Sequence, residues 1–368
     1  MTQTPAPKKS VQLSGVVVAE SAVSSIDPDE GVLMYRGYDI ADLAEHSTYE
    51  EVAYLLLHGE LPSADELASF GETLARRDLP EHVVRIVDDL ARSAEPMALL
   101  RTAASALTLG EKLSDLDTAT RLIAALPTAI ARQHRRRQGL EPIAPDPELS
   151  YAENFLAMLH GERPDARKAH IFDVAMILHA EHEMNASTFT ARVVAGTGAD
   201  LAAAITAGIA ALSGPLHGGA NAAAMALFEQ WGSAAATPDA VRGMFERKEK
   251  LFGFGHPLYR AYDPRAVILK RYSEELSTDA GDPNWFAITD AAERTVFEEK
   301  GLFPNVDLYS ASVYRYLGVP TDLFTPLFAA SRVAGQAAHV LEQHADNRII
   351  RPSATYVGAS RRPYPASR

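Results

Sequence analysis

The chain has 368 residues, 47% hydrophobic and 23% charged, which suits a globular protein with one large core or two domains. Its formal net charge of -13 disfavours nucleic acid and anionic membranes as partners, and the absence of cysteine excludes disulfides, thiolate metal sites and cysteine nucleophiles. The sequence has neither an apolar run of membrane-spanning length nor a secretion signal, so we expect no membrane partner and a cytoplasmic location.

Strand signals are confined to the N-terminal part of the chain. The segments SGVVVAES (residues 14–21) and GVLMYRGY (residues 31–38) flank the turn-rich SSIDPDEG (residues 24–31). Two β-prone segments around such a turn predict one small antiparallel hairpin.

Helix signals dominate the rest of the chain. Three capping-box patterns precede apolar-periodic runs: Ser47 with Glu50, Ser63 with Glu66, and Ser150 with Glu153. The first of these runs, EEVAYLLLHGELPS, should end at Gly59. Alanine-rich tracts at residues 201–212 and 328–344 have the propensity and small side chains of buried central helices. The sequence therefore predicts an all-α, multi-helical fold with a small N-terminal β-hairpin.

Glycine and proline cluster at two possible joints, SGPLHGGAN (residues 213–221) and GLFPNVD (residues 301–307). About one small domain's worth of chain lies between them. We expect a large discontinuous domain formed by residues 1–217 and 313–368, and a small domain formed by residues 218–312.

The segment RQHRRRQG, residues 132–139, is the most basic stretch of this acidic chain. We interpret it as the solvated end of a helix capped by Gly139, where cations favour the helix dipole. A phosphate contact is the alternative.

The segment HAEHEMNAST (residues 179–188) contains His179, His182, Glu183 and Asn185. On a helix the two histidines would share one face. Three interpretations stay open: a contact to an anionic substrate, a structural polar helix, and a metal site, although the metalloprotease spacing is absent.

His217 lies between a proline turn and two glycines, just before an expected helix. The helix dipole disfavours its protonated form, and a neutral imidazole can donate a hydrogen bond to a developing oxyanion. The flanking Gly218 and Gly219 would allow a ligand to approach the backbone closely. A surface turn histidine is the alternative.

Residues 251–266, LFGFGHPLYRAYDPRA, combine a glycine loop with His256, Arg260 and Arg265. The spacing is not that of a dinucleotide-binding fingerprint. Backbone N–H groups and arginines suit a nucleotide-like or carboxylate-bearing ligand, and an ordinary connecting loop is the alternative.

Two further candidates follow in the C-terminal third. Asp307, after a proline turn, is either a helix N-cap or a general base. Arg332 stands inside an apolar helix, where a charge is costly unless it is paired or binds an anion. Arg348 and Arg351 lie near enough to the chain end to reach another subunit.

Taken together and in this order, these motifs resemble the citrate synthase family, which includes 2-methylcitrate synthases. The resemblance covers almost the whole chain, from GVLMYRGYDIADLA through HAEHEMNASTFTARV, LSGPLHGGAN, GFGHPLYRAYDPRA and PNVDLYSASVY to EQHADNRIIRPSATYVG. It implies an all-helical homodimer with a large and a small domain, an active site in the cleft between them, and no metal or permanently bound cofactor.

The resemblance also implies roles for individual residues. His217 corresponds to the histidine that polarises the acetyl carbonyl of acetyl-CoA, Asp307 to the base that removes a methyl proton, and His256 to the histidine that protonates the ketone of oxaloacetate. The implied oxaloacetate contacts are His182, Arg265, Arg332 and, donated across the dimer, Arg351. The implied coenzyme A contacts, in the small domain, are Leu251, Phe252, Gly253, Phe254, Gly255 and Arg260.

Two positions depart from the commonest pattern of the family. Pro257 stands where many members have arginine, and Gln336 where many have tryptophan. The segments GHPLY and RPSATYVG resemble those of 2-methylcitrate synthases, which accept propionyl-CoA. We expect a citrate synthase, with 2-methylcitrate synthase as the alternative. Remoter alternatives are a non-catalytic binding or regulatory subunit of the same fold and a metal-dependent hydrolase that uses His179 and His182.

Overall fold

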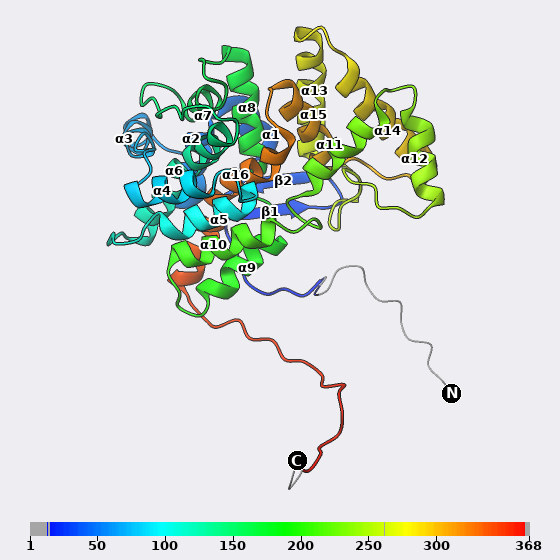
Figure 1. Ribbon diagram of the computed structural model, residues 1–368. Coiled ribbons are helices and arrows are strands. Elements are labelled where there is room, and N and C mark those ends of the chain that lie inside the picture. Colours follow the sequence, from blue (N-terminus) through cyan, green and yellow to red (C-terminus); the bar gives the residue numbers. More distant parts are fainter. Residues whose placement is uncertain (1–12, 14, 261, 365–368) are drawn as a thin grey trace.

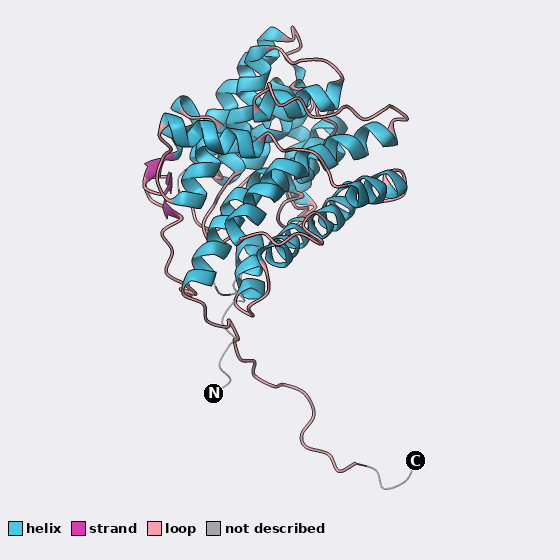
Figure 2. Ribbon diagram, turned by 90° about the vertical axis from the view of Figure 1, so that its left-hand side faces the viewer, coloured by secondary structure: helices cyan, strands magenta, loops and turns pink. Residues whose placement is uncertain are grey.

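A computed structural model describes residues 13, 15–260 and 262–364. Helices make up most of the described chain, and the one small sheet lies at the edge of the helical body, on the left in Figure 2. The predicted all-α fold with a small β element is confirmed.

The sheet has three antiparallel strands in the order β1 (Ser24–Asp27), β2 (Val32–Tyr35), β3 (Tyr38–Asp39). The prediction that residues 14–21 form a strand is wrong for the described residues 15–21, while residue 14 lies outside them. Val16 and Val17 are 56% and 86% exposed, so their valine side chains have no apolar surface to pack against. The first strand instead falls in the segment expected to turn, where Ser24 pairs with Tyr35.

The N-terminal half contributes one long helix, α6, and several shorter helices. They are α1 (Ile40–His46), α2 (Tyr49–His58), α3 (Ala64–Leu74), α4 (Glu81–Leu90), α5 (Pro96–Ala106), α6 (Asp115–Arg137), α7 (Tyr151–His160), α8 (Ala166–His179), α9 (Ala186–Ala195) and α10 (Leu201–Leu212).

The C-terminal half contributes shorter helices and one long buried helix. They are α11 (Ala220–Trp231), α12 (Thr237–Glu246), α13 (Pro264–Asp279), α14 (Asn284–Lys300), α15 (Val306–Tyr316), the 3-10 turn η1 (Thr321–Leu323) and α16 (Phe324–Ala345). Figure 1 shows α11 to α15 gathered on one side of the molecule and α2 to α10 on the other. Every residue of α16 from 324 to 340 is buried, so this helix forms the centre of the core.

Local signals fixed most helix ends. The capping boxes at Ser63 and Ser150 and the left-handed cap at Gly59 form as expected. The predicted box at Ser47 and Glu50 is wrong by one residue, because Thr48 caps α2 with Glu51. Threonine and serine offer the same hydroxyl, so the sequence alone leaves this register open.

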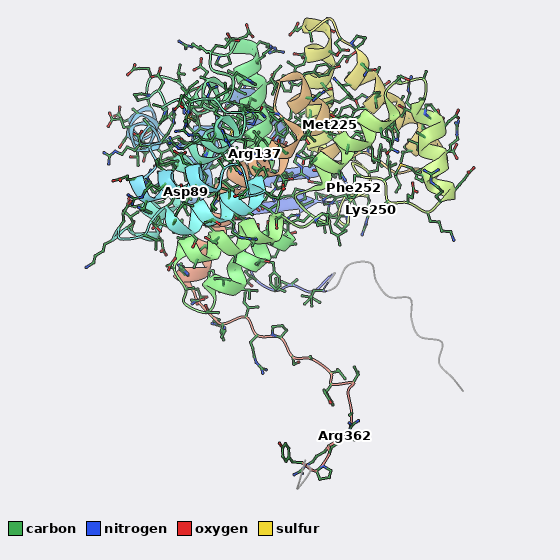
Figure 3. The ribbon with its side chains drawn as sticks, in the orientation of Figure 1. Asp89, Arg137, Met225, Lys250, Phe252 and Arg362 are labelled. Atoms are coloured by element: carbon green, nitrogen blue, oxygen red, sulfur yellow. The ribbon has the colours of Figure 1, made fainter. Side chains whose placement is uncertain are left out.

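The basic stretch at the end of α6 is a helix end stabilised by ion pairs. Arg132 and Arg136 bind Asp88, and Arg137 binds Asp322. Figure 3 labels Arg137 where α6 ends among the surrounding helices. Gly139 follows with a positive φ of 74°, as the cap prediction requires. None of the described helices is both long and apolar enough to cross a bilayer.

Candidate active site

A cleft of ≈ 1020 Å³ brings together side chains that are far apart in the sequence. Its lining includes six of the predicted site residues, which are His182, His217, His256, Arg265, Asp307 and Arg332. The loop formed by residues 251–255 lines the same cleft. The three groups expected to carry acid–base chemistry therefore share one cavity.

His217 is held by the first turn of α9. Its Nε2 lies 2.9 Å from the Ser187 hydroxyl and 3.3 Å from the Ser187 backbone nitrogen. A backbone N–H can only donate, so Nε2 accepts and the ring proton is on Nδ1. Burial, reinforced by the positive charge of Arg332, lowers the pKa of His217 to about 4. The imidazole is therefore a neutral N–H donor at physiological pH.

His256 is oriented by the backbone of its own turn. The backbone N–H groups of Leu258 and Tyr259 donate to its Nδ1, at 3.1 and 3.4 Å. The proton of the neutral ring is therefore on Nε2. Burial and the nearby Arg265 lower the pKa of His256 to about 4. The cleft thus holds two neutral imidazoles with opposite tautomers.

Asp307 is the carboxylate of the cleft. The N-cap interpretation of this residue is wrong, because Asn305 caps α15 and accepts from the Asp307 N–H at 3.0 Å. No hydrogen bond to the Asp307 carboxylate is formed by the described residues. Burial raises its pKa from 3.8 to about 7. A carboxyl group with such a pKa can act as a base near neutral pH.

His182 belongs to the loop after α8. The prediction that it shares a helix face with His179 is wrong, since α8 ends at His179. His182 is buried, its Nε2 lies 3.1 Å from the Tyr259 hydroxyl, and its ring packs against His256 at 5.0 Å between centroids. Within the described chain, no group of three or more His, Asp or Glu side chains is arranged to hold a metal ion.

The two buried arginines reach the cleft in different ways. Arg265, in the first turn of α13, makes a two-point pair with Asp263 at 2.9 and 2.8 Å. Arg332, in the middle of α16, donates from Nε to the His179 carbonyl at 2.7 Å. Its Nη1 is buried and has no partner among the described residues. Both guanidiniums are buried at the cleft, and their planar N–H groups suit two-point binding of a carboxylate.

The glycine loop is attached to the start of α15. Gly255 donates to the Phe303 carbonyl at 2.9 Å, and Asn305 donates to the Gly253 carbonyl at 3.0 Å. A Cβ on Gly253 would lie 3.1 Å from the Cα of Leu308, so the close approach needs glycine. Figure 3 labels Lys250 and Phe252 at this loop.

Two predicted site residues lie outside the cleft lining. Arg260 is largely exposed and pairs with Asp29 at 2.7 Å. Arg351 is exposed on the extended segment that follows α16, which runs away from the helices toward Arg362 (Figure 3). A role for either residue would require a bound ligand or a second subunit.

Sequence reasoning missed the residues that hold the site in place. Ser187 orients His217, Asp263 pairs with Arg265, and Tyr259 contacts His182. The spacing DPR at residues 263–265 was a usable signal, because an aspartate N-cap two residues before an arginine can pair with it. No local pattern connects Ser187 with His217, since 30 residues separate them.

Comparison with known proteins gives matches over nearly the whole chain. The sequence model of a protein family described as "Citrate synthase, C-terminal domain" matches residues 12–353. A citrate synthase from Haloferax volcanii is 47% identical and covers 94% of this chain and 95% of its own length. A 2-methylcitrate synthase from Shewanella oneidensis is 44% identical, with 95% of each chain covered.

Solved structures agree with the sequence matches. The citrate synthase from Pyrobaculum aerophilum superposes with a TM-score of 0.89 at 40% identity, covering 96% of this chain and 94% of its own. The ternary complex of the Thermoplasma acidophilum citrate synthase with carboxymethyl coenzyme A and oxaloacetate gives 0.90 at 34% identity, with 96% and 97% covered.

Proposed function

Because the chain belongs to the citrate synthase family, we propose that it condenses acetyl-CoA with oxaloacetate and water to give citrate and CoA. The observation that carries this proposal is the shared cleft of His217, His256 and Asp307. The same observation argues against a non-catalytic subunit of this fold, which would have no need of three acid–base groups in one cavity.

The first step is removal of a methyl proton from the acetyl thioester by Asp307. A carboxylate is far too weak a base for this carbon acid in water, so the enolate oxygen must be stabilised as charge develops. The neutral His217 N–H is the donor for that oxygen. An imidazolium would be unnecessary here, because the reaction needs a hydrogen bond that strengthens in the transition state.

The second step joins the nucleophilic carbon to the ketone carbon of oxaloacetate. As the new carbon–carbon bond forms, the ketone oxygen takes the proton of His256, whose Nε2–H is free of protein acceptors among the described residues. The ring then regains a proton in place of the one it gave, and Asp307 releases the methyl proton, so both groups return to their starting states. The product of this step is citryl-CoA, and water then cleaves its thioester to citrate and CoA.

Recognition of oxaloacetate falls to His182, Arg265 and Arg332, which line the cleft together. The two carboxylates of the substrate explain why an acidic protein buries two arginines here. Loop residues Leu251 to Gly255, with Arg260, form the proposed coenzyme A site. We further propose that Arg351 reaches the partner's cleft in a homodimer.

In the proposed two-domain division, α11 to α14 belong to the small domain, residues 218–312. The boundary at which the chain returns to the large domain, between residues 312 and 313, lies inside α15. Closure of that domain on residues 1–217 and 313–368 would exclude water until citryl-CoA forms. The cytoplasmic location and the lack of a metal requirement stay predictions of the sequence.

The second candidate activity is 2-methylcitrate synthesis from propionyl-CoA. It is favoured by the 44% identity to the Shewanella enzyme, only slightly below the 47% to the Haloferax enzyme. One additional methylene changes binding in a pocket by only about 1–3 kcal/mol, so both activities in one protein are compatible with this cleft.

Steady-state kinetics with oxaloacetate and either acyl-CoA test both proposals. We expect kcat/KM for acetyl-CoA to exceed that for propionyl-CoA. A preference of about twentyfold for propionyl-CoA, equivalent to about 1.8 kcal/mol and near the middle of the range for one methylene, would assign the second activity instead. Absence of CoA release with both substrates would refute the proposed function.

A further inference from the structure

One face of α16 carries a row of functional residues behind the cleft. Arg332, Gly335 and His339 occupy positions i, i+3 and i+7 and therefore lie along the same side of the helix. The backbone N–H of Gly335 donates to the Ala180 carbonyl at 3.2 Å. A Cβ on Gly335 would lie 2.2 Å from Glu181 Oε2, so glycine lets the loop after α8 rest directly on the helix.

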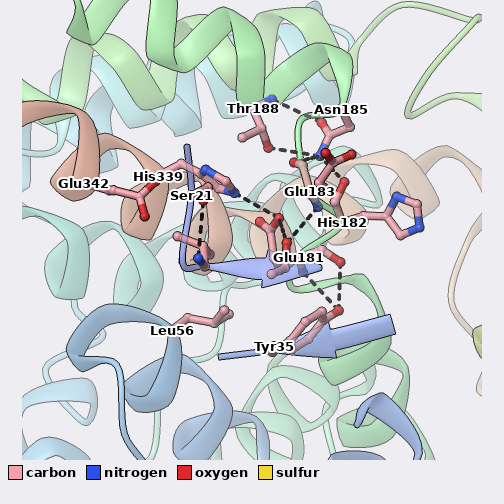
Figure 4. Close-up of polar contacts among 12 residues, drawn as sticks. Ser21, Tyr35, Leu56, Glu181, His182, Glu183, Asn185, Thr188, His339 and Glu342 are labelled. Carbon is pink, nitrogen blue, oxygen red and sulfur yellow. Dashed lines mark hydrogen bonds and ion pairs between the residues drawn. The ribbon is translucent and has the colours of Figure 1, made fainter. Parts of the chain in front are cut away.

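This contact places Glu181 above Gly335, between Arg332 and His339. The Glu181 side chain is fully buried, and its Oε1 accepts from His339 Nε2 at 3.0 Å and from the Ser24 hydroxyl at 3.0 Å (Figure 4). Its Oε2 is buried and has no hydrogen-bond partner in the described part of the chain. Burial opposes ionisation, yet the hydrogen bond from His339 and the positive charge of Arg332 keep the pKa of Glu181 below its usual value.

The histidine beside Glu181 does not cancel that charge. Arg192 donates from Nε to His339 Nδ1 at 3.1 Å, and a guanidinium can only donate. The His339 proton is therefore on Nε2, facing Glu181, and this tautomer is neutral. Arg192 in turn forms an ion pair with Glu342, so its own charge is already matched.

Arg265 and Arg332 thus differ in whether a carboxylate of the protein pairs directly with their positive charge. Asp263 binds Arg265 directly, whereas no described carboxylate lies within ion-pair distance of Arg332. Burial lowers the pKa of Arg332 to about 10, and the charge of Glu181 is the largest influence opposing that decrease. Arg332 keeps a buried, unpartnered Nη1 in a residue that lines the cleft.

We propose that Glu181 is a positioning residue: it supplies the counter-charge of Arg332 before oxaloacetate binds, and it weakens the hold of Arg332 on the incoming carboxylate. This inference rests on the proposed function. A resident anion makes a buried arginine tolerable in the unliganded fold, at the cost of affinity for the substrate. Arg265, with its direct partner, is a permanent part of the site, whereas Arg332 is available to the ligand.

Glu181→Gln separates charge from geometry. The amide oxygen can still accept from His339 and Ser24, so the loop keeps its hydrogen bonds, while the negative charge is lost. We expect KM for oxaloacetate to decrease about threefold or more, with no comparable change in KM for acyl-CoA, since charges close to a buried ion change affinity on this scale. We also expect a lower Tm without ligand and a larger rise in Tm on adding oxaloacetate.

Glu342→Gln is the matched control. It removes a carboxylate from the same network, next to Arg192 and away from Arg332, and we expect its KM for oxaloacetate to stay within about twofold of wild type. An equal decrease in both variants would show a general charge effect and overturn the proposal. An unchanged KM and an unchanged ligand-induced Tm shift in Glu181→Gln would overturn it as well.

A double-mutant cycle with Arg332→Gln covers the case in which the single variant folds poorly. If the two charges compensate each other, the double variant should unfold at a higher temperature than the additive sum of the single changes. Additive losses would refute the pairing. These results are separable from the proposed function, which fails only if wild type itself does not consume oxaloacetate with an acyl-CoA.

Discussion

The two halves of the cleft are built on different physical principles. On the acyl side, His217 is a neutral ring oriented by a backbone N–H donor, and the Asp307 carboxylate has no described hydrogen-bond donor. On the anion side, Arg265 and Arg332 are buried cations held by a carboxylate or a carbonyl. The groups that take part in proton transfer keep a reactive protonation state, whereas the arginines that bind the charges of the substrate are held in place by the protein.

This difference follows from what each group must do. A base or an acid must change its protonation state during the reaction, so a strong resident partner would lock one state. An arginine keeps its charge throughout and only has to be in the correct place when the dianion arrives. Changes on the acyl side should therefore reduce kcat, and changes on the anion side should increase KM.

The largest effect is expected for Asp307→Ala. Removing the base should lower kcat by about 10²- to 10⁴-fold, the usual contribution of a positioned general base. Calorimetric titration should show that oxaloacetate still binds with an affinity close to that of wild type. Retention of full activity would contradict the assignment of Asp307 as the base.

His217→Gln should have the next largest effect. Loss of a donor aimed at a developing oxyanion typically costs about 10²- to 10³-fold in kcat. KM for oxaloacetate should change little, because that substrate lies against other residues of the cleft. Exchange of the acetyl methyl protons with solvent, followed by NMR, should slow in parallel with turnover. If exchange stayed fast, His217 would act after proton removal.

Arg265→Lys addresses the anion side. Lysine cannot reproduce the two-point contact with Asp263, so we expect KM for oxaloacetate to increase about 10- to 100-fold, with a smaller decrease in kcat. Arg85→Lys is the control, because Arg85 is exposed and pairs with Glu81 of the same helix, α4, at 2.8 Å, outside the cleft lining. If the Arg265 variant showed a decrease in kcat with an unchanged KM, the expectation that the anion side controls KM would be contradicted.

The pH dependence of kcat should report Asp307 alone between pH 5 and 8. Its raised pKa of about 7 means that the base is ionised above that pH and protonated below it, so kcat should fall about tenfold per pH unit in acid. His217 and His256, with pKa values of about 4, are neutral throughout this range. If the fall in kcat near pH 7 stayed at the same pH in Asp307→Glu but moved in His256→Gln, the titrating group would be His256 and not Asp307.

The same pKa links the site to stability. A carboxyl group that is harder to ionise in the fold stabilises the protein most below its unfolded pKa of 3.8, and this contribution is lost as pH rises through about 7. Asp307→Asn should therefore raise Tm at pH 8 more than at pH 4, which scanning calorimetry at the two pH values can measure.

The sequence predicted the helices and the acid–base residues better than it predicted the residues that hold them in place. Helix ends at Gly59 and Ser63 follow from capping chemistry, which acts over a few residues. His217 and Asp307 stood out because glycine and proline turns surround them. The contacts of Ser187 with His217 and of Glu181 with His339 join distant segments, and only packing brings them together. The strand error near Val17 has the same origin, because β-propensity says nothing about whether a partner strand is present.

The smallest expected effect comes from the glycine loop of residues 251–255, in Gly253→Ala. A methyl group there would meet Leu308, the neighbour of Asp307, and the residue has a φ of 88°. We expect KM for acyl-CoA to increase and kcat to decrease, each about three- to tenfold, because overpacking of about 1–3 kcal/mol would shift both the loop and the base. Gly139→Ala introduces the same backbone strain at a φ of 74°, with no atom of the described residues within 4 Å of the added methyl group, so it should lower Tm and leave both constants unchanged. Equal kinetics for the two variants would mean that the loop does not position Asp307, and that the acyl side depends on the start of α15 alone.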